Sequence, residues 1–206
     1  MFCCHGNGAD HATPEELILS GAINYGGVEC FNEAQPNSGR LALKQACSRQ
    51  SKASFVESPS GDCELLLNVP FTSSVRLKGL CVSAGLEAGV CSRPLLVKLF
   101  ANSSLDIGEC REAAATQELT LSTPDEAAEL WHNLKVAKFG DLHRLQLYFQ
   151  GEQGEGAAGM RVYYVGLKAE VGLPRVGVVH ATYEARAQLA DHKQQEQLAG
   201  GSSLTQ

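Results

Sequence analysis

The chain has 206 residues, of which 44% are hydrophobic and 19% are charged, and its net charge is −6. A chain of this size and hydrophobicity is expected to form one domain with a real core, and its acidic balance argues against non-specific binding to nucleic acid or to an anionic membrane surface. It has neither an apolar run of about 18 residues nor a secretory signal at its start. No transmembrane helix is expected, and the sequence favours an intracellular protein.

Residues 1–12 are rich in cysteine, histidine and glycine and are expected to form a flexible tail. Four side chains there are candidate ligands for a soft metal ion: Cys3, Cys4, His5 and His11. Adjacent cysteines do not have the spacing of a structural zinc site, so a tail without metal is favoured and no cofactor is predicted. The TPEE motif at residues 13–16 combines an N-cap, a proline and a capping-box glutamate, which predicts a short helix.

Residues 34–53 are polar, and Lys44, Arg49 and Lys52 make them locally basic, which indicates a solvated surface loop. The next stretch, residues 63–85, organises the prediction. Its run Leu-Leu-Leu-Asn-Val at 65–69 is typical of a strand covered on both faces, and the hydroxyl residues 72–74 predict a turn. The sequence therefore predicts a hairpin here. Alternation in its second strand places one set of side chains on one face and a second set on the other: Val75, Leu77, Gly79 and Cys81 against Arg76, Lys78, Leu80 and Val82.

Further strands are predicted from short apolar or alternating runs: residues 28–33, 94–102, 117–121, 134–139, 142–150, 160–171 and 176–183. In the strand at 94–102, Leu95, Val97 and Leu99 share one face. Residues 106–115 are predicted to be irregular, and residues 124–131 to form a short helix that contains Trp131. About nine or ten short strands with two brief helices are typical of an all-β sandwich or jelly roll.

The cysteines beyond the tail have no C-x-x-C spacing, and most are interpreted as small buried hydrophobic residues in a reducing compartment. The sequon that begins at Asn102 is then expected to be unused. Residues 154–159 match G-x-G-x-x-G, but a strand follows, so a hairpin loop is favoured over a dinucleotide site. No G-x-S-x-G motif is present, and His132, His143 and His180 are interpreted as surface or core residues. An enzyme is therefore not expected.

Six ordered blocks resemble the PITH domain family, the proteasome-interacting module of a thioredoxin-like protein. They are VECFNE (28–33), FVES (55–58), ELLLNVPF (64–71), VRLKGL (75–80), VYYVGLKAE (162–170) and TYEARAQLADHK (182–193). The chain looks most similar to members that carry this domain alone. The resemblance implies a galactose-binding-like jelly roll over residues 13–193, followed by a flexible tail at 194–206. The redox activity of the thioredoxin-like relative is not carried over, because the C-x-x-C motif is absent.

The resemblance further implies a non-enzymatic interaction module whose partner is the regulatory particle of the 26S proteasome. The surface residues expected to contact it are Arg76, Lys78, Tyr183, Glu184, Asp191 and His192. A cytoplasmic location, with the nucleus as a second one, is expected. Two alternatives stay open: a structural subunit of a cytoskeletal or ciliary (axonemal) assembly, and a jelly roll that binds a sugar or another small ligand. Because Trp131 is the single tryptophan, aromatic stacking on a sugar is disfavoured.

Overall fold

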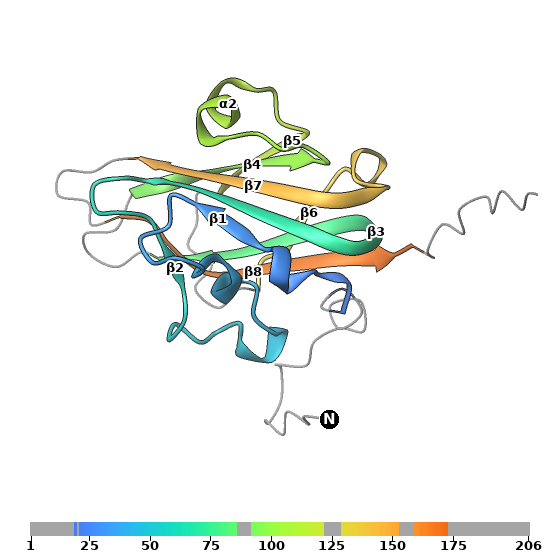
Figure 1. Ribbon diagram of the computed structural model, residues 1–206, viewed down its shortest axis with the longest axis horizontal. Helices are drawn as coiled ribbons and strands as arrows, with labels where there is room; N and C mark the ends of the chain where they lie inside the picture. The colour runs from blue at the N-terminus through green and yellow to red at the C-terminus, as the bar shows by residue number, and fades with distance from the viewer. Residues whose placement is uncertain (1–18, 20, 86–91, 122–128, 153–158, 173–206) are drawn as a thin grey trace, which may run out of the picture. The chain divides into compact units, whose positions relative to one another are not determined.

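The computed structural model describes residues 19, 21–85, 92–121, 129–152 and 159–172 (Figure 1). Within these ranges eight strands pair in antiparallel fashion. They are β1 (Glu29–Phe31), β2 (Val56–Glu57), β3 (Glu64–Ala84), β4 (Ser92–Ala101), β5 (Gln117–Leu121), β6 (His132–Asn133), β7 (Leu142–Glu152) and β8 (Arg161–Val171). The helical elements are short: α2 (Ile107–Glu112) and the 3-10 turns η1 (Tyr25–Gly27), η2 (Gly39–Ala42), η3 (Ala46–Ser48) and η4 (Val136–Lys138).

The predicted hairpin at 63–85 is wrong, because β3 runs through the hydroxyl residues as one bent strand. Its first half pairs with β7, with a register shift between Pro70 and Val75, and its second half pairs with β8 from Val75 onward. At the bend, the Thr72 hydroxyl donates to the carbonyl of Ala22, and the Ser74 hydroxyl donates to the Asp141 carboxylate. These long-range hydrogen bonds take the place of the local ones that would have closed a turn.

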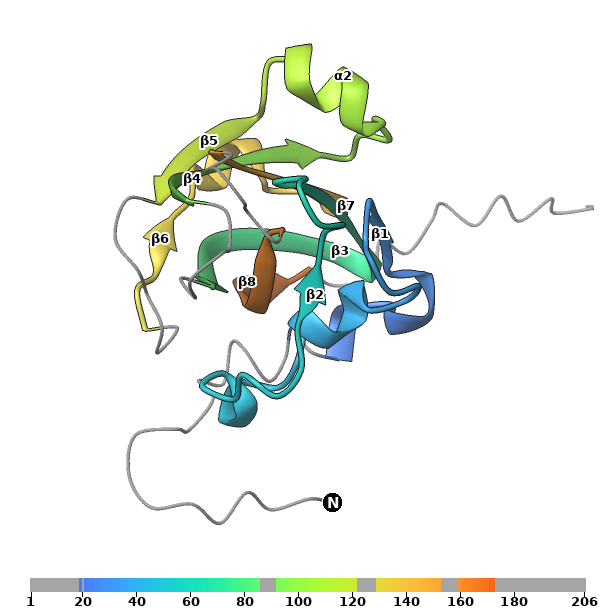
Figure 2. The same ribbon diagram turned by 90° about the vertical axis from the view of Figure 1, so that its left-hand side faces the viewer.

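Because β3 takes part in both layers, the strands form a β-sandwich with jelly-roll character. One layer contains β1, the first half of β3, β7, β4 and β5; the other contains β2, β8, the second half of β3 and β6. Figure 2 shows the layers edge on, with β4, β5 and β7 above β3 and β8. The main core lies between them and includes Leu65, Leu67, Val97, Leu147 and Val165. The all-β sandwich prediction is confirmed.

The outer face of the first layer is covered by α2, which lies beyond β4 and β7 (Figures 1 and 2). Leu66, Phe100 and Tyr148 pack there with Cys110 of the helix, so the prediction that residues 65–69 are covered on both faces is confirmed. The prediction that residues 106–115 are irregular is wrong. The helix begins at a capping box, in which the Asp106 carboxylate accepts from the Glu109 amide and the Glu109 carboxylate accepts from the Asp106 amide.

The outer face of the second layer is shaped by a β-bulge at Lys78. Leu77 pairs with Ala169 and Gly79 pairs with Lys168, so Lys78 is the additional residue. The bulge reverses the alternation: Val75 and Leu77 lie in the main core, but so do Leu80 and Val82, while Cys81 lies on the outer face. The predicted face for Gly79 and Cys81 is therefore wrong.

Trp131 also departs from the prediction, because it precedes β6 and is not helical. It packs on Cys81 and Tyr164, over positions 79 and 166, where glycines leave room for its ring. The predicted strand at 134–139 is wrong as well, since η4 occupies this stretch. The surface loop at 34–53 is only partly confirmed, because it contains η2 and η3 and buries Ala42 and Leu43 in the main core.

The remaining strand predictions agree with the structure: β1, β4, β5, β7 and β8 lie within a few residues of their predicted positions, and Leu95, Val97 and Leu99 share the core face of β4. The G-x-G-x-x-G segment does not join a hairpin, because β7 and β8 pair with opposite sides of β3. Most of it (154–158), and the predictions at 13–16, 124–128 and 176–183, lie outside the described residues.

The cysteine prediction is confirmed for Cys81 and Cys110, which are buried and not disulfide-bonded. Cys63 is buried as well, but it differs because it is disulfide-bonded.

Candidate interaction surface

Two of the predicted contact residues, Arg76 and Lys78, meet at one carboxylate on the outer face of the second layer. Lys78 Nζ lies 2.6 Å from Glu170 Oε1, and Arg76 Nη1 lies 3.8 Å from Glu170 Oε2. The Lys78 hydrogen bond, together with the charges of Lys78 and Arg76, lowers the pKa of Glu170. Two cations therefore share one carboxylate in this cluster.

The Arg76 side chain is 57% exposed, the Glu170 side chain 51% and the Lys78 side chain 31%. The cluster thus faces solvent, and its ion pairs are of the exposed kind that adds little stability. Arg76 and Lys78 lie on the same face, as alternation along a strand predicts for residues two positions apart, and the bulge changes the alternation only from Gly79 onward. The other predicted contact residues, Tyr183, Glu184, Asp191 and His192, lie outside the described residues, as do Cys3, Cys4, His5 and His11.

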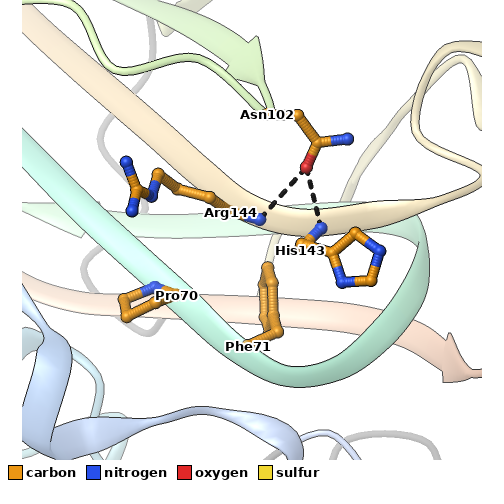
Figure 3. Close-up of a pocket in the computed structure, with 5 residues that line it drawn as sticks. All are labelled: Pro70, Phe71, Asn102, His143 and Arg144. Carbon is orange, nitrogen blue, oxygen red and sulfur yellow. Dashed lines mark hydrogen bonds between the residues drawn. The ribbon is translucent and has the colours of Figure 1, made fainter. Parts of the chain in front are cut away.

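A second surface feature, missed by the sequence reasoning, is an open cavity at the bend of β3. Its volume is about 550 Å³, and it is lined by Pro70, Phe71, Asn102, His143 and Arg144 (Figure 3). Strand pairing brings these residues together, since Pro70 is the register partner of Arg144, and Asn102 follows the end of β4. We call this feature the end cavity.

Asn102 fixes the wall of the end cavity. Its Oδ1 accepts hydrogen bonds from the backbone amides of His143 (2.8 Å) and Arg144 (3.2 Å), as Figure 3 shows. Its Nδ2 donates to the carbonyl of Asp141 at 2.8 Å, and its φ of 54° lies in the left-handed region that asparagine tolerates. Both polar atoms of the amide are therefore committed, and the side chain positions the first residues of β7.

The two basic side chains of the end cavity differ in their surroundings. His143 Nε2 lies 3.5 Å from Asp141 Oδ1, and this carboxylate also accepts from the Ser74 hydroxyl. Arg144 is half-buried, and its guanidinium forms no ion pair or side-chain hydrogen bond with any described residue. No sequence pattern distinguishes Arg144, because its isolation depends on which side chains the fold leaves distant from it.

A smaller hollow of about 220 Å³ lies beside β2 and is lined in part by Leu41, Phe55 and Glu57. Its charged and aromatic groups satisfy one another: Arg161 Nε donates to Glu57 Oε1 at 2.8 Å and its guanidinium lies 5.0 Å from the Phe55 ring centre. The Phe55 ring in turn meets Tyr163 edge to face. This arrangement is typical of packing rather than of a binding site.

Neither hollow offers an open aromatic face for a sugar. Trp131 packs against Cys81 and Tyr164, away from the residues that line the hollows, and Phe71 of the end cavity is only 8% exposed. The described residues also contain no group of three or more histidine, cysteine or carboxylate side chains that could hold a metal ion. Nor is any helix within the described ranges long and apolar enough to cross a membrane.

Comparison with known proteins gives one consistent family. The sequence profile of the PITH domain matches residues 9–187. A PITH domain-containing protein of Drosophila melanogaster is 36% identical over 93% of this chain and 90% of its own length. PITH domain-containing protein 1 of Danio rerio is 35% identical over 86% of this chain and 82% of its own length.

Among solved structures, the chain is similar to CBM32-3 from a family 31 glycoside hydrolase of Clostridium perfringens, with a TM-score of 0.44 and 7% sequence identity. The superposition covers 74% of this chain and 97% of that chain. The sandwich described above rests on the strand pairing of this chain itself. The profile match and the two relatives each span more than four fifths of the sequence. The chain belongs to the PITH domain family.

Proposed function

We propose that this chain is a non-enzymatic interaction domain that docks on a large intracellular assembly, the regulatory particle of the 26S proteasome. Membership of the PITH domain family supports a non-catalytic interaction domain, and the resemblance to a proteasome-interacting module is the reason for proposing this partner. A cytoplasmic location, with access to the nucleus, follows from this proposal.

The observation that carries the proposal is the exposed cluster of Arg76, Lys78 and Glu170. Glu170 pairs with both cations, so two positive charges share one carboxylate at an exposed site on a chain whose net charge is −6. Such a charge at the rim of an interface selects an acidic partner surface and speeds association more than it adds affinity. An acidic patch on the assembly is therefore the expected counterpart.

The test is an affinity pull-down of the tagged full chain from native cell extract, followed by mass spectrometry. The Arg76→Glu and Lys78→Glu double variant is compared with a matched control, Lys135→Glu and Lys138→Glu, which makes the same change of charge at exposed residues around η4. Regulatory-particle subunits should be recovered with the wild type and the control and be lost with the first variant. Circular dichroism confirms that each variant is folded.

Two outcomes would contradict the proposal. Recovery of proteasome subunits that is equal for all three proteins would remove the Arg76 cluster from the interface. A wild-type sample that brings down no proteasome subunits, but a stoichiometric set of cytoskeletal or axonemal proteins, would replace the proteasome with the cytoskeletal or ciliary assembly.

A further inference from the structure

The end cavity contains a charge that no described residue balances. Acidic residues outnumber basic ones in this chain, 23 to 17. Arg144 is nevertheless half-buried without an ion pair among the described residues, in a hollow whose other walls include Pro70 and Phe71. Partial burial removes water from a guanidinium, which costs free energy. An anion that takes the place of the lost water lowers this cost. An unpaired, half-buried arginine at an open cavity therefore indicates a site for an anion.

The neighbouring groups leave Arg144 as the donor of this site. The Asn102 amide is committed on both sides to the backbone of residues 141–144. His143 lies beside the Asp141 carboxylate, so its imidazole already has an acidic partner within the protein. A guanidinium presents parallel N–H groups that match the two oxygens of one carboxylate.

We propose that the end cavity binds an acidic side chain from a polypeptide segment of a partner protein, with its carboxylate on Arg144 and an adjacent apolar side chain against Pro70 and Phe71. Figure 3 shows Arg144 of β7 above Pro70 and Phe71 of β3, so that one ligand reaches the charge and the apolar wall together. This proposal does not depend on the identity of the assembly proposed above.

Two features favour a carboxylate on a polypeptide over a phosphate or a small molecule. A phosphate dianion needs several positive donors, and the end cavity offers a single unpaired guanidinium, because its other basic side chain, His143, lies beside the Asp141 carboxylate. Small-molecule sites enclose most of their ligand, whereas the end cavity is open to solvent and suits a chain that lies across it. Its apolar wall also requires an apolar group beside the charge.

The experiment is an NMR titration of the isotope-labelled full chain with the peptide acetyl-Gly-Glu-Phe-Gly-amide. We expect saturable shifts of the Arg144 Nε–H, the Asn102 side-chain amide and the His143 backbone amide. The matched peptide with Gln in place of Glu should bind at least about tenfold more weakly, since a hydrogen bond between charged groups exceeds the free energy of a tenfold change in affinity. Inorganic phosphate is titrated in parallel.

The variants separate charge from structure. Arg144→Gln should weaken binding of the Glu peptide by about tenfold or more, while Lys135→Gln, at the exposed N-cap of η4, should leave it unchanged. If Arg144→Gln fails to fold, Arg144→Lys retains the charge and should reduce but not abolish binding. The proposal is overturned if the Glu and Gln peptides bind equally, if no signal of the end cavity shifts, or if phosphate binds more tightly than the Glu peptide.

Discussion

Lys98 Nζ donates to the backbone carbonyl of Arg111 at 2.8 Å, and thereby binds the last turn of α2 to the strand beneath it. It also donates to the carbonyl of Cys110 at 3.2 Å, and the side chain is only 9% exposed. The final carbonyls of a helix have no partner within the helix. A buried ammonium thus takes the place of water at this helix end.

Replacing this lysine is expected to loosen α2. Lys98→Met keeps the apolar stem but leaves both carbonyls without their charged donor, and the free energy of unfolding should fall by about 1–3 kcal/mol. Urea unfolding followed by circular dichroism measures it. Lys135→Met, at an exposed position, serves as the control and should change little. Equal stability of Lys98→Met and the wild type would show that solvent satisfies these carbonyls.

Asn102 is expected to hold the end cavity through its hydrogen bonds and not through its backbone conformation alone. Asn102→Gly accepts the φ of 54° without strain but loses the bonds to the His143 and Arg144 amides, and Asn102→Ala loses the bonds and adds strain. Unfolding free energy should fall by about 1–2 kcal/mol for the glycine variant and further for the alanine variant.

Hydrogen exchange distinguishes the two contributions at Asn102. The amides of His143 and Arg144 should exchange faster in both variants, while Asn102→Asp, which keeps an acceptor oxygen, should protect them as the wild type does. Unchanged protection in Asn102→Gly would mean that the first residues of β7 keep their position without the Asn102 side chain. The same hydrogen bonds explain why glycan attachment at Asn102 conflicts with the fold, since Nδ2 already donates to Asp141.

The elements that sequence predicts correctly are those whose signal is local. Leu95, Val97 and Leu99 alternate along β4, and the apolar run around Leu66 indicates burial on both faces; both patterns hold in the structure. The capping box of α2 was equally local, and its Asp106 and Glu109 spacing was sufficient to predict the helix that the sequence analysis missed.

The errors arise where distant partners decide the structure. Residues 72–74 have turn chemistry, but their hydroxyls bond to Ala22 and Asp141, which the local sequence does not reveal. The bulge at Lys78 exchanges the two faces of β3, and no local sequence pattern indicates it. The end cavity was missed for the same reason, because Arg144 is distinguished only in the fold, where its guanidinium has no partner among the described residues.

Gly166 lies beneath the Trp131 ring, and we expect this position to tolerate no larger residue. A Cβ there would lie 2.7 Å from Tyr164 Cε1 and 3.2 Å from Trp131 Cη2. Gly166→Ala should therefore displace the indole, shift its fluorescence to longer wavelength, and lower the unfolding free energy by about 1–3 kcal/mol. Trp131 is the single tryptophan, so its emission reports on this site alone.

Gly21→Ala provides the control for this experiment, because a Cβ at Gly21 has no neighbour within 4 Å. Its emission wavelength should match that of the wild type, and its unfolding free energy should match or exceed that of the wild type. An unshifted spectrum for Gly166→Ala would show that Trp131 does not rest on β8 in solution.

The Arg76, Lys78 and Glu170 cluster makes stability depend on pH in a defined direction. The pKa of Glu170 is lowered below its ordinary value of 4.5, first by the Lys78 hydrogen bond. A carboxylate with a lowered pKa in the folded state contributes stability above its unfolded pKa, and this contribution is lost as the pH falls through the lowered value. Glu170→Gln should therefore be less stable than the wild type at about pH 6, and the difference should shrink as the pH falls through the lowered pKa of Glu170.

Chemical unfolding across this pH range measures the difference, with Glu118→Gln as the control at an exposed carboxylate on β5. Because the cluster is exposed, about 1 M salt should shrink the effect at neutral pH. If the difference in unfolding free energy between wild type and Glu170→Gln persists at low pH, the Glu170 side chain stabilises the fold by packing and not by its charge. A gap that closes on acidification would instead show that Glu170 holds Arg76 and Lys78 by charge, as docking on an acidic surface requires.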